Sequence, residues 1–334
     1  MTAFIKAISY YLPEKELHNG ELSSIFPEWH VEKIANKIGI ETRHIAAEDE
    51  FASDMAVAAA NKLFADHGID PAAIDFILYC TQSPDYFLPS TACIIQHRLN
   101  LPVSAGALDF NLGCSGFVYG LALAKGLIVA GIAKHILLIT SETYSKFIHP
   151  KDKGNRTIFG DAAAATLIST IGFASIGEFE LGTDGKGADN LMVKQGAIRY
   201  PEKSAETLQD GFGNKRSGAK LHMDGPEIFS FTSAIVPTLI TRTLAKNLTA
   251  KGDIEQFILH QANQYILEHL RKKLAINHEH FFIYMAKVGN TVSSSIPIAL
   301  YEAMNQKKEI QGTKYLLAGF GVGYSWGGTV ITFS

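Results

Sequence analysis

Short runs of β-branched and aromatic residues alternate along this chain with longer stretches rich in alanine. The clearest short runs are "FILYCTQ", "HILLITS", "FILHQAN" and "KYLLAGF". The clearest long stretches are "SDMAVAAANKLFADHG" and "IPIALYEAMNQKK". Continuous apolar runs of this length are typical of strands buried on both faces, and alanine-rich stretches favour helix. The pattern therefore predicts an α/β fold with mainly buried strands.

The ends of the predicted segments carry polar signals. Ser53 or Asp54 is a suitable N-cap for the first long helix, and Gly68 is a suitable residue to end it. Residues 201–220, "PEKSAETLQDGFGNKRSGAK", are polar and contain glycine, which predicts a mobile loop or linker there.

The chain also repeats itself. Three pairs of segments resemble each other in the same order, namely 70–82 with 251–263, 113–124 with 289–300, and 156–168 with 317–331. The shared order predicts a duplicated fold with halves of about 170 residues, a period too long for a solenoid. We therefore expect an N-terminal half, 1–172, and a C-terminal half, 173–334, related by pseudo-symmetry.

Composition and charge narrow the class of protein. Of the 334 residues, 47% are hydrophobic and 19% are charged, which suits a compact chain with a large core. The formal net charge of −3, with both signs interspersed, predicts no nucleic-acid partner. We find no basic leader with an apolar core and no apolar run long enough to span a bilayer, so we expect no membrane partner. Three cysteines in a long chain argue against a disulfide framework and favour a cytoplasmic location.

One of these cysteines, Cys114, stands in "GCSG", where a turn leads into a long apolar stretch. Backbone N–H groups at a helix N-terminus favour the thiolate, lower the pKa of the thiol and hold a developing oxyanion, so this position suits a nucleophile. A small buried residue in a tight turn is the alternative interpretation, and the motif by itself leaves it open. Cys80 and Cys93 lack flanking turns, and we interpret both as packing residues.

Two polar residues occupy positions where partners of Cys114 are expected. His260 follows the strand "FIL", and active sites of α/β proteins are commonly built at strand C-termini. A neutral imidazole there donates a hydrogen bond to a carbonyl or acts as a base towards a thiol. Asn290 lies in the turn that corresponds to Cys114 in the repeat and adds a donor that does not titrate, while helix capping is a compatible alternative role. The twelve histidines show no metal-ligand spacing, so we expect no metal site.

The segment "GFGVGYSWGG", residues 319–328, contains five glycines. It follows an apolar run and leads into the last strand without a helix after it, so it does not match a phosphate-binding loop. A backbone without bulky side chains instead brings a main-chain amide close to the thiol of Cys114.

Taken together, Cys114, "HQAN" at 260–263, "GNT" at 289–291 and "GFGVGYSWG" resemble the ketoacyl-acyl-carrier-protein synthase III family of the thiolase superfamily. The resemblance runs over nearly the whole chain, through "YLPE", "GIETRHIA", "SDMA", "LPSTAC", "IFGDAAAA" and "GTDG". It implies a thiolase-like five-layered αβαβα fold of two similar halves, which agrees with the duplication, and it implies a homodimer.

The resemblance also implies an activity, a decarboxylative Claisen condensation performed by Cys114, His260 and Asn290. An acyl thioester primer is transferred to Cys114, and the amides of Cys114 and Val322 hold the oxyanion. Malonyl-acyl-carrier protein then gives a 3-oxoacyl-acyl-carrier protein and CO2, the initiation step of fatty acid biosynthesis. No resident cofactor is implied, because coenzyme A and phosphopantetheine thioesters enter as substrates and acyl carrier protein is the partner. A degradative thiolase would need a second cysteine in the C-terminal glycine loop, which holds none.

Several positions that bind the carrier in this family differ here. Lys33 and Lys153 stand where a tryptophan and an arginine clamp the adenine of coenzyme A, and lysine stacks less well than either. Trp29 lies too far upstream to be equated with that tryptophan. Tyr265 replaces an arginine that helps to dock the carrier protein.

Three further positions bear on carrier and primer. Lys272 and Lys273 match basic residues that would meet an acidic carrier, and a solvated helix face is the alternative interpretation. Leu88 matches a residue that reaches from one subunit into the acyl pocket of the other. A leucine in place of an aromatic leaves more room for the primer.

These departures keep a second interpretation open, a specialised synthase III-like enzyme or acyltransferase of secondary metabolism with another primer, carrier or acceptor. A non-catalytic chain-length subunit is the alternative from a different class, and the retained cysteine, histidine and asparagine argue against it. A hydroxymethylglutaryl-type synthase needs a glutamate base, and "FILYCTQSPDY" offers none. Primer length and donor carrier stay open at this point.

Overall fold

The computed structural model describes residues 2–28, 30–204, 206–209, 215–307 and 309–334, with the backbone alone for 32–34, 208, 215 and 216. The first elements are β1 (Phe4–Tyr11), β2 (Glu16–His18), α1 (Asn19–Ile25), α2 (Val31–Ile38), β3 (Thr42–His44), α3 (Ala52–His67), β4 (Phe76–Cys80), α4 (Thr91–Arg98), β5 (Gly106–Phe110), α5 (Gly116–Val129), β6 (His135–Glu142), α6 (Lys153–Arg156) and β7 (Ala162–Ser169).

The later elements are β8 (Ala174–Thr183), β9 (Leu191–Met192), β10 (Leu208–Gln209), β11 (Lys215–Arg216), β12 (His222–Met223), α7 (Gly225–Lys246), β13 (Ile254–Leu259), α8 (Gln264–Lys273), α9 (Ser295–Gln306), β14 (Lys314–Gly321) and β15 (Ser325–Phe333). Short 3-10 turns are η1 (Pro71–Ala73), η2 (Tyr144–Lys146), η3 (Gly185–Asn190), η4 (Lys251–Asp253), η5 (His278–His280) and η6 (Val292–Ser294).

The main sheet consists of two runs of strands with the same topology. Among the described residues its order is β13-β14-β15-β8-β1-β7-β6-β4-β5. In the first run, β1 pairs with β7 and β7 pairs with β6, both antiparallel, and β6 pairs with β4 in parallel. In the second run, β8 pairs with β15 and β15 pairs with β14, both antiparallel, and β14 pairs with β13 in parallel. Among the described strands, the two runs pair directly only between β1 and β8, where Phe4 and Ile5 pair with Ser175 and Ala174.

The repeat extends to the outer edge of each run. β5 lies parallel to β4 at the first edge, and a single parallel bridge between Phe257 and Phe281 takes the corresponding place beside β13. The predicted fold of two pseudo-symmetric halves is therefore confirmed. The boundary after residue 172 stays a prediction, and β8 begins at Ala174.

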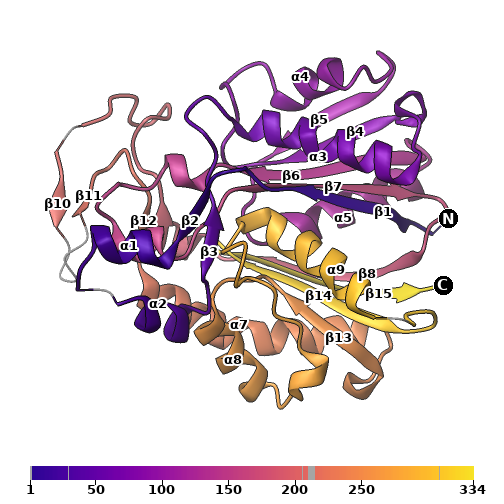
Figure 1. The fold of residues 1–334 in the computed structure, drawn as a ribbon. Coiled ribbons are helices and arrows are strands. Elements are labelled where there is room, and N and C mark those ends of the chain that lie inside the picture. Colours follow the sequence, from indigo (N-terminus) through magenta and orange to yellow (C-terminus); the bar gives the residue numbers. More distant parts are fainter. Residues whose placement is uncertain (1, 29, 205, 210–214, 308) are drawn as a thin grey trace.

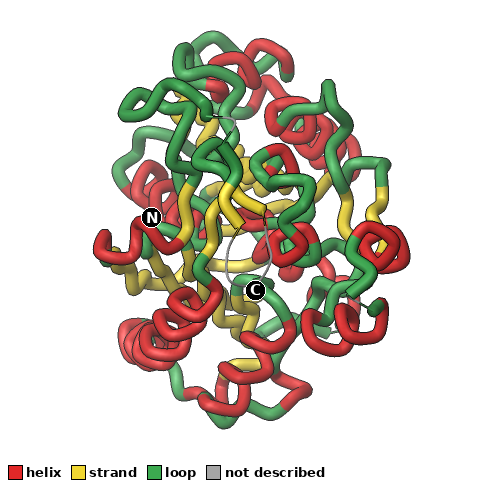
Figure 2. Tube along the Cα trace, turned by 90° about the vertical axis from the view of Figure 1, so that its left-hand side faces the viewer, coloured by secondary structure: helices red, strands yellow, loops and turns green. Residues whose placement is uncertain are grey.

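Helices cover both outer faces and fill the space between the runs, which gives the layers αβαβα (Figure 1). α3 and α4 pack on the outer face of the first run, α5 and α9 lie between the runs, and α7 and α8 cover the second run. α5 is apolar almost all round because it is packed between two sheets. Figure 2 shows the strands between groups of helices from a second direction.

The helix predicted from Ser53 begins slightly earlier than expected. Its N-cap is Phe51, whose N–H donates to Oδ2 of Asp54 at 2.8 Å. The Asp54 carboxylate, in the first turn of the helix, therefore accepts the hydrogen bond of the Phe51 amide. The Ser53 hydroxyl accepts a hydrogen bond of 3.1 Å from Arg98 and caps no backbone amide of the described chain. The N-cap prediction was wrong for this reason. The predicted end is confirmed, because Gly68 has a left-handed φ of 59° that favours glycine.

The polar segment 201–220 is only partly described. It contributes the short antiparallel pair β10 and β11, and residues 205 and 210–214 lie outside the described residues. Its mobility stays a prediction.

By length and composition, α7 is the one helix of the described chain that could cross a membrane. In this fold it packs on the second run, where Val236, Leu239, Ile240 and Leu244 join a buried cluster with residues of β13 and β14. Its apolar face is therefore explained by packing in the core.

Candidate active site

Cys114 lies in the turn between β5 and α5, and its side chain is buried. The turn is closed by a hydrogen bond of 2.8 Å from the Gly116 N–H to the Gly113 carbonyl. A Cβ at Gly113 would lie 2.5 Å from Oε1 of Gln82, and a Cβ at Gly116 would lie 2.3 Å from Sγ of Cys80. The two glycines are therefore required by close approach of neighbouring side chains.

The C-terminal glycine loop closes over this turn. A Cβ at Gly321 would lie 2.8 Å from both Cβ and Sγ of Cys114, so only glycine leaves room for the thiol. The Ser115 and Ser325 hydroxyls share a hydrogen bond of 2.6 Å that ties the turn to the loop. The sequence interpretation of "GFGVGYSWGG" as a close approach to Cys114 is confirmed.

Two opposing effects act on the thiol. Burial raises the pKa of Cys114 to about 12, while hydrogen bonds from the Val322 and Cys114 backbone N–H groups lower the pKa and the nearby Glu142 carboxyl raises it. The expectation that the helix N-terminus gives Cys114 a lowered pKa was wrong for this structure, because burial outweighs the amides. The amides nevertheless point at the sulfur, where an oxyanion would develop.

His260 follows β13 directly, as the sequence predicted, and is 3% exposed. Its backbone N–H donates to the Ala318 carbonyl at 2.8 Å, which fixes the residue to β14. Its ring nitrogen Nδ1 lies 2.7 Å from Oγ of Ser295. Burial lowers the pKa of His260 to about 3, and the Val292 carbonyl raises it only in part. The imidazole is therefore neutral at ordinary pH.

Asn290 lies in the turn before α9, which corresponds to the Cys114 turn before α5. Its Oδ1 accepts a hydrogen bond of 2.9 Å from the Val292 N–H, and its Nδ2 donates to the Ala262 carbonyl at 3.3 Å. Since the carbonyl end is taken by Val292, the amide end is the side that can serve a ligand.

Val292 connects the three predicted residues. It shares one buried cluster with Cys114, its carbonyl acts on the ring of His260, and its amide binds Asn290. Val292 adopts a left-handed φ of 54°, which is uncommon for a β-branched residue. The turn is therefore held by its surroundings in the conformation that brings these groups together.

Sequence reasoning missed a polar network behind Cys114. Glu142, at the end of β6, is fully buried and accepts hydrogen bonds from the Gln82 N–H at 3.0 Å, the Ser83 hydroxyl at 3.3 Å and the Ser293 hydroxyl at 2.9 Å. The buried Tyr144 donates its hydroxyl to Oε1 of Gln82. A carboxylate directly after the apolar run "HILLITS" was the signal available in the sequence.

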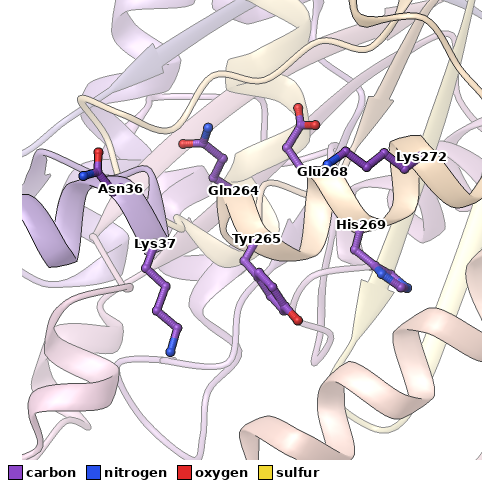
Figure 3. Close-up of a pocket in the computed structure, with 7 residues that line it drawn as sticks. All are labelled: Asn36, Lys37, Gln264, Tyr265, Glu268, His269 and Lys272. Atoms are coloured by element: carbon purple, nitrogen blue, oxygen red, sulfur yellow. The ribbon is translucent and has the colours of Figure 1, made fainter.

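A surface cavity of about 490 Å³ lies between α2 and α8. It is lined by Asn36, Lys37, Gln264, Tyr265, Glu268, His269 and Lys272. Of the predicted carrier-binding residues, Tyr265 and Lys272 face this cavity. Figure 3 shows Lys37, which was not predicted, extending to the same side as Tyr265. The Lys33 side chain and Trp29 lie outside the described residues.

The remaining predicted carrier and primer residues lie elsewhere. Lys153 pairs with Glu28 at 3.0 Å, and Lys273 donates to the Ser233 carbonyl on α7 at 2.9 Å. Leu88 is 83% exposed in the loop between β4 and α4. None of these three side chains lines the cavity beside Tyr265. Within the described residues no group of three metal-ligating side chains is brought together.

Comparisons with known proteins point to one family. A family model described as 3-oxoacyl-[acyl-carrier-protein] synthase III matches residues 108–185, and the model of its C-terminal part matches residues 244–333. A β-ketoacyl-[acyl-carrier-protein] synthase III of Caldanaerobacter subterraneus is 34% identical over 339 residues, which cover 100% of this chain and 98% of that protein.

Two solved structures similar to this chain are also 3-oxoacyl-(acyl-carrier-protein) synthases. A 3-oxoacyl-(acyl-carrier-protein) synthase III is 46% identical with a TM-score of 0.97, and the match covers 100% of both chains. A 3-oxoacyl-(acyl-carrier-protein) synthase of Burkholderia xenovorans is 35% identical with a TM-score of 0.90, over 100% of this chain and 95% of that one. Fold and site define a condensing acyltransferase of the thiolase fold. Within that class, the chain belongs to the 3-oxoacyl-[acyl-carrier-protein] synthase III family, as the sequence resemblance predicted.

Proposed function

We propose that this enzyme transfers an acyl primer from a thioester to Cys114 and condenses it with malonyl-acyl-carrier protein. The products are a 3-oxoacyl-acyl-carrier protein and CO2. One observation carries the proposal: the backbone N–H groups of Cys114 and Val322 converge on the Cys114 sulfur, in a turn that also touches the His260 and Asn290 segment through Val292. Such paired amides stabilise the oxyanion of an acyl transfer.

In the first half-reaction the Cys114 sulfur attacks the thioester carbonyl of the primer. The thiol proton goes to the neutral imidazole of His260 and from there to the leaving thiolate, so a free thiol carrier departs. The high pKa of Cys114 and the low pKa of His260 mean that a thiol and a neutral ring are the resting forms. The proton therefore moves only as the new carbon–sulfur bond forms.

In the second half-reaction the malonyl carboxylate leaves as CO2, and its electron pair passes to the thioester oxygen to give an enolate. His260 and the Nδ2 of Asn290 donate hydrogen bonds to that oxygen. The enolate carbon then attacks the acyl group, the carbon–sulfur bond to Cys114 breaks, and the Cys114 thiolate takes up a proton from solution.

The substrates and partners follow from the same proposal. Coenzyme A and phosphopantetheine thioesters enter as substrates, with no resident cofactor, and acyl carrier protein is the protein partner. We place the enzyme in the cytoplasm as a homodimer. The dimer is supported by the exposed apolar side chains of Tyr86, Phe87 and Leu88, at 62%, 73% and 83%, and by the unpaired edge of β5 among the described strands.

Intact mass spectrometry tests the proposal. After mixing with a panel of acyl-CoA and acyl-carrier thioesters, the wild type is expected to gain one acyl group and Cys114→Ala none. Addition of malonyl-acyl-carrier protein should discharge the adduct and release CO2. An unmodified wild-type enzyme with every thioester would overturn the proposal.

A second candidate is a specialised enzyme of secondary metabolism with another primer, carrier or acceptor. It is favoured by Lys153, which is paired with Glu28 and so is not free to bind a phosphate, and by Tyr265 at the cavity beside α8. Product analysis with malonyl-acyl-carrier protein against malonyl-CoA distinguishes the two candidates, since only the first requires the carrier protein as acceptor.

A further inference from the structure

Among the described residues, the ring of His260 has one side-chain hydrogen-bond partner, the hydroxyl of Ser295. Oγ of Ser295, the first residue of α9, lies 2.7 Å from Nδ1, and both residues are buried, at 2% and 3% exposure. Phe320 stands against the ring at a centroid distance of 5.8 Å and an angle of 85°. Because water has little access here, the protonation of Nδ1 depends on what Ser295 offers it.

The Ser295 hydroxyl has one proton and two possible acceptors. Oγ lies 2.9 Å from the Val292 carbonyl and 2.7 Å from Nδ1 of His260. The Gln261 N–H also points at Oγ, at 3.4 Å, and can only donate. A hydroxyl donates one hydrogen bond and accepts others, so Ser295 suits either form of the neutral ring.

These contacts define two arrangements. In the first, Ser295 donates to the Val292 carbonyl and accepts from a protonated Nδ1, which leaves a lone pair on Nε2. In the second, Ser295 donates to a bare Nδ1, so that the ring proton resides on Nε2. The side of the ring that faces away from Ser295 is thus an acceptor in one arrangement and a donor in the other.

We propose that Ser295 is a positioning residue that lets His260 serve as proton acceptor in one half-reaction and as hydrogen-bond donor in the other. The inference rests on the proposed function. Acyl transfer uses the first arrangement, because Nε2 must take the Cys114 proton and return it to the leaving thiolate. Decarboxylation uses the second, because Nε2 must donate to the enolate oxygen. The ring is neutral before and after each half-reaction, so the change of arrangement moves one ring proton and consumes none.

Removing the Ser295 hydroxyl should fix which ring nitrogen of His260 carries the proton. In Ser295→Ala the polar group that remains on this side of the ring is the Val292 carbonyl, which lies 2.9 Å from Oγ of Ser295 in the wild type and can only accept. The proton is therefore held on Nδ1 and Nε2 keeps its lone pair. Acyl transfer to Cys114 should survive, whereas malonyl decarboxylation should fall by about 10- to 100-fold, the range seen for partners that orient metal-bound histidines, used here by analogy.

The two half-reactions are measured separately. Acylation is followed by intact mass, and decarboxylation by CO2 release from malonyl-acyl-carrier protein on the pre-acylated enzyme. Ser295→Thr, which keeps a hydroxyl, should recover decarboxylation. Ser294→Ala is the matched control, since this neighbouring buried serine bonds to Thr140 and not to His260. An equal loss in both half-reactions of Ser295→Ala, or no loss in either, would overturn the inference.

A measurement on the wild type needs no variant to fold. In enzyme with ¹⁵N-labelled histidine, the shifts of the two ring nitrogens report which one is protonated. We expect a proton on Nδ1 in the free enzyme and on Nε2 after the acyl-enzyme binds a malonyl thioester analogue that cannot decarboxylate. One unchanged tautomer in both samples contradicts the inference. If the wild type forms no acyl-enzyme, the proposed function itself has failed, which is a different result.

Discussion

The hydroxyl of Ser293 donates a hydrogen bond of 2.9 Å to Oε1 of Glu142, although 151 residues separate them in the chain. Glu142 ends β6 of the first run of strands, and Ser293 belongs to η6 in the segment that carries Asn290. The carboxyl also accepts the Gln82 N–H, so it connects the Cys114 side of the site with the Asn290 side. A buried carboxyl in such a position should affect both stability and the nucleophile.

Glu142 should make the protein less stable as the pH rises. Burial raises the pKa of Glu142 from 4.5 to about 8, so at pH 6.5–8 the folded state holds a proton that the unfolded state has lost. Its stabilising contribution is therefore present below pH 4.5 and is lost as the pH passes 8. We expect the free energy of unfolding to fall by up to about 1.4 kcal/mol per pH unit in this window. Urea unfolding at several pH values measures the slope.

Glu142→Gln tests the origin of that slope. The variant does not titrate, so its free energy of unfolding should be nearly constant between pH 6.5 and 8. Glu255→Gln is the control, because Glu255 forms an accessible pair with Lys307 at 2.6 Å and should leave the slope unchanged. A wild-type slope in Glu142→Gln would rule out Glu142 as its source.

Glu142 should also slow the reaction of Cys114 with alkylating reagents. Burial is the main cause of the raised pKa of Cys114, and the Glu142 carboxyl raises it further. Above pH 8, where Glu142 is ionised, removing that charge in Glu142→Gln should lower the pKa of the thiol and speed iodoacetamide labelling of Cys114. Peptide mass spectrometry measures this, with Cys93 as the internal control. Cys93 was predicted to be a packing residue, but its side chain is exposed, so its labelling rate should not change. A slower Cys114 in the variant would contradict the expectation.

The sequence predicted those parts of the fold and the site that depend on local pattern. The buried strands appear as apolar runs because side chains on both faces are covered by helices. Cys114 and His260 could be predicted as site residues because each stands where a strand or turn meets a helix, a position that a short motif reveals. The shared order of the three pairs of similar segments was sufficient to predict the duplicated fold.

The rest depends on contacts between distant segments, which no local pattern reveals. In the sequence alone, nothing distinguishes Ser295 from the other serines of "VSSS"; only the fold places it beside His260. Glu142 resembles a polar residue at the end of a strand until Ser293 and Gln82 surround it. The lowered pKa expected for Cys114 was wrong for the same reason, since the extent of burial is a tertiary property that outweighs the local effect of the helix.

Gln82 should limit the length of the primer. Its carboxamide lies against Gly113, one residue before the nucleophile, and Tyr144 holds it there. The double variant Gln82→Ala with Tyr144→Phe removes the carboxamide without leaving a buried hydroxyl unpaired. We expect longer acyl groups to gain about fourfold in acylation rate per methylene, from about 0.8 kcal/mol of burial each.

The acyl-CoA panel measures this change in preference. Gln96→Ala is the control, because Gln96 donates to the Leu101 carbonyl next to α4 and lies outside the site. An unchanged chain-length profile in the double variant would place the limit on primer length elsewhere, for example at Leu88.

Gly321 should tolerate no side chain without displacing the nucleophile. A Cβ there would stand 2.8 Å from both Cβ and Sγ of Cys114, closer than real Cβ atoms approach other heavy atoms. Gly321→Ala should therefore move the sulfur away from the Val322 amide and slow acylation roughly 100-fold, as expected for a displacement near 1 Å. Gly126→Ala in α5 is the matched control, because a Cβ there meets nothing within 4 Å. That control should keep its activity and gain about 0.5–1 kcal/mol in the free energy of unfolding. Equal acylation rates for the two alanine variants would show that the glycine loop does not confine the thiol.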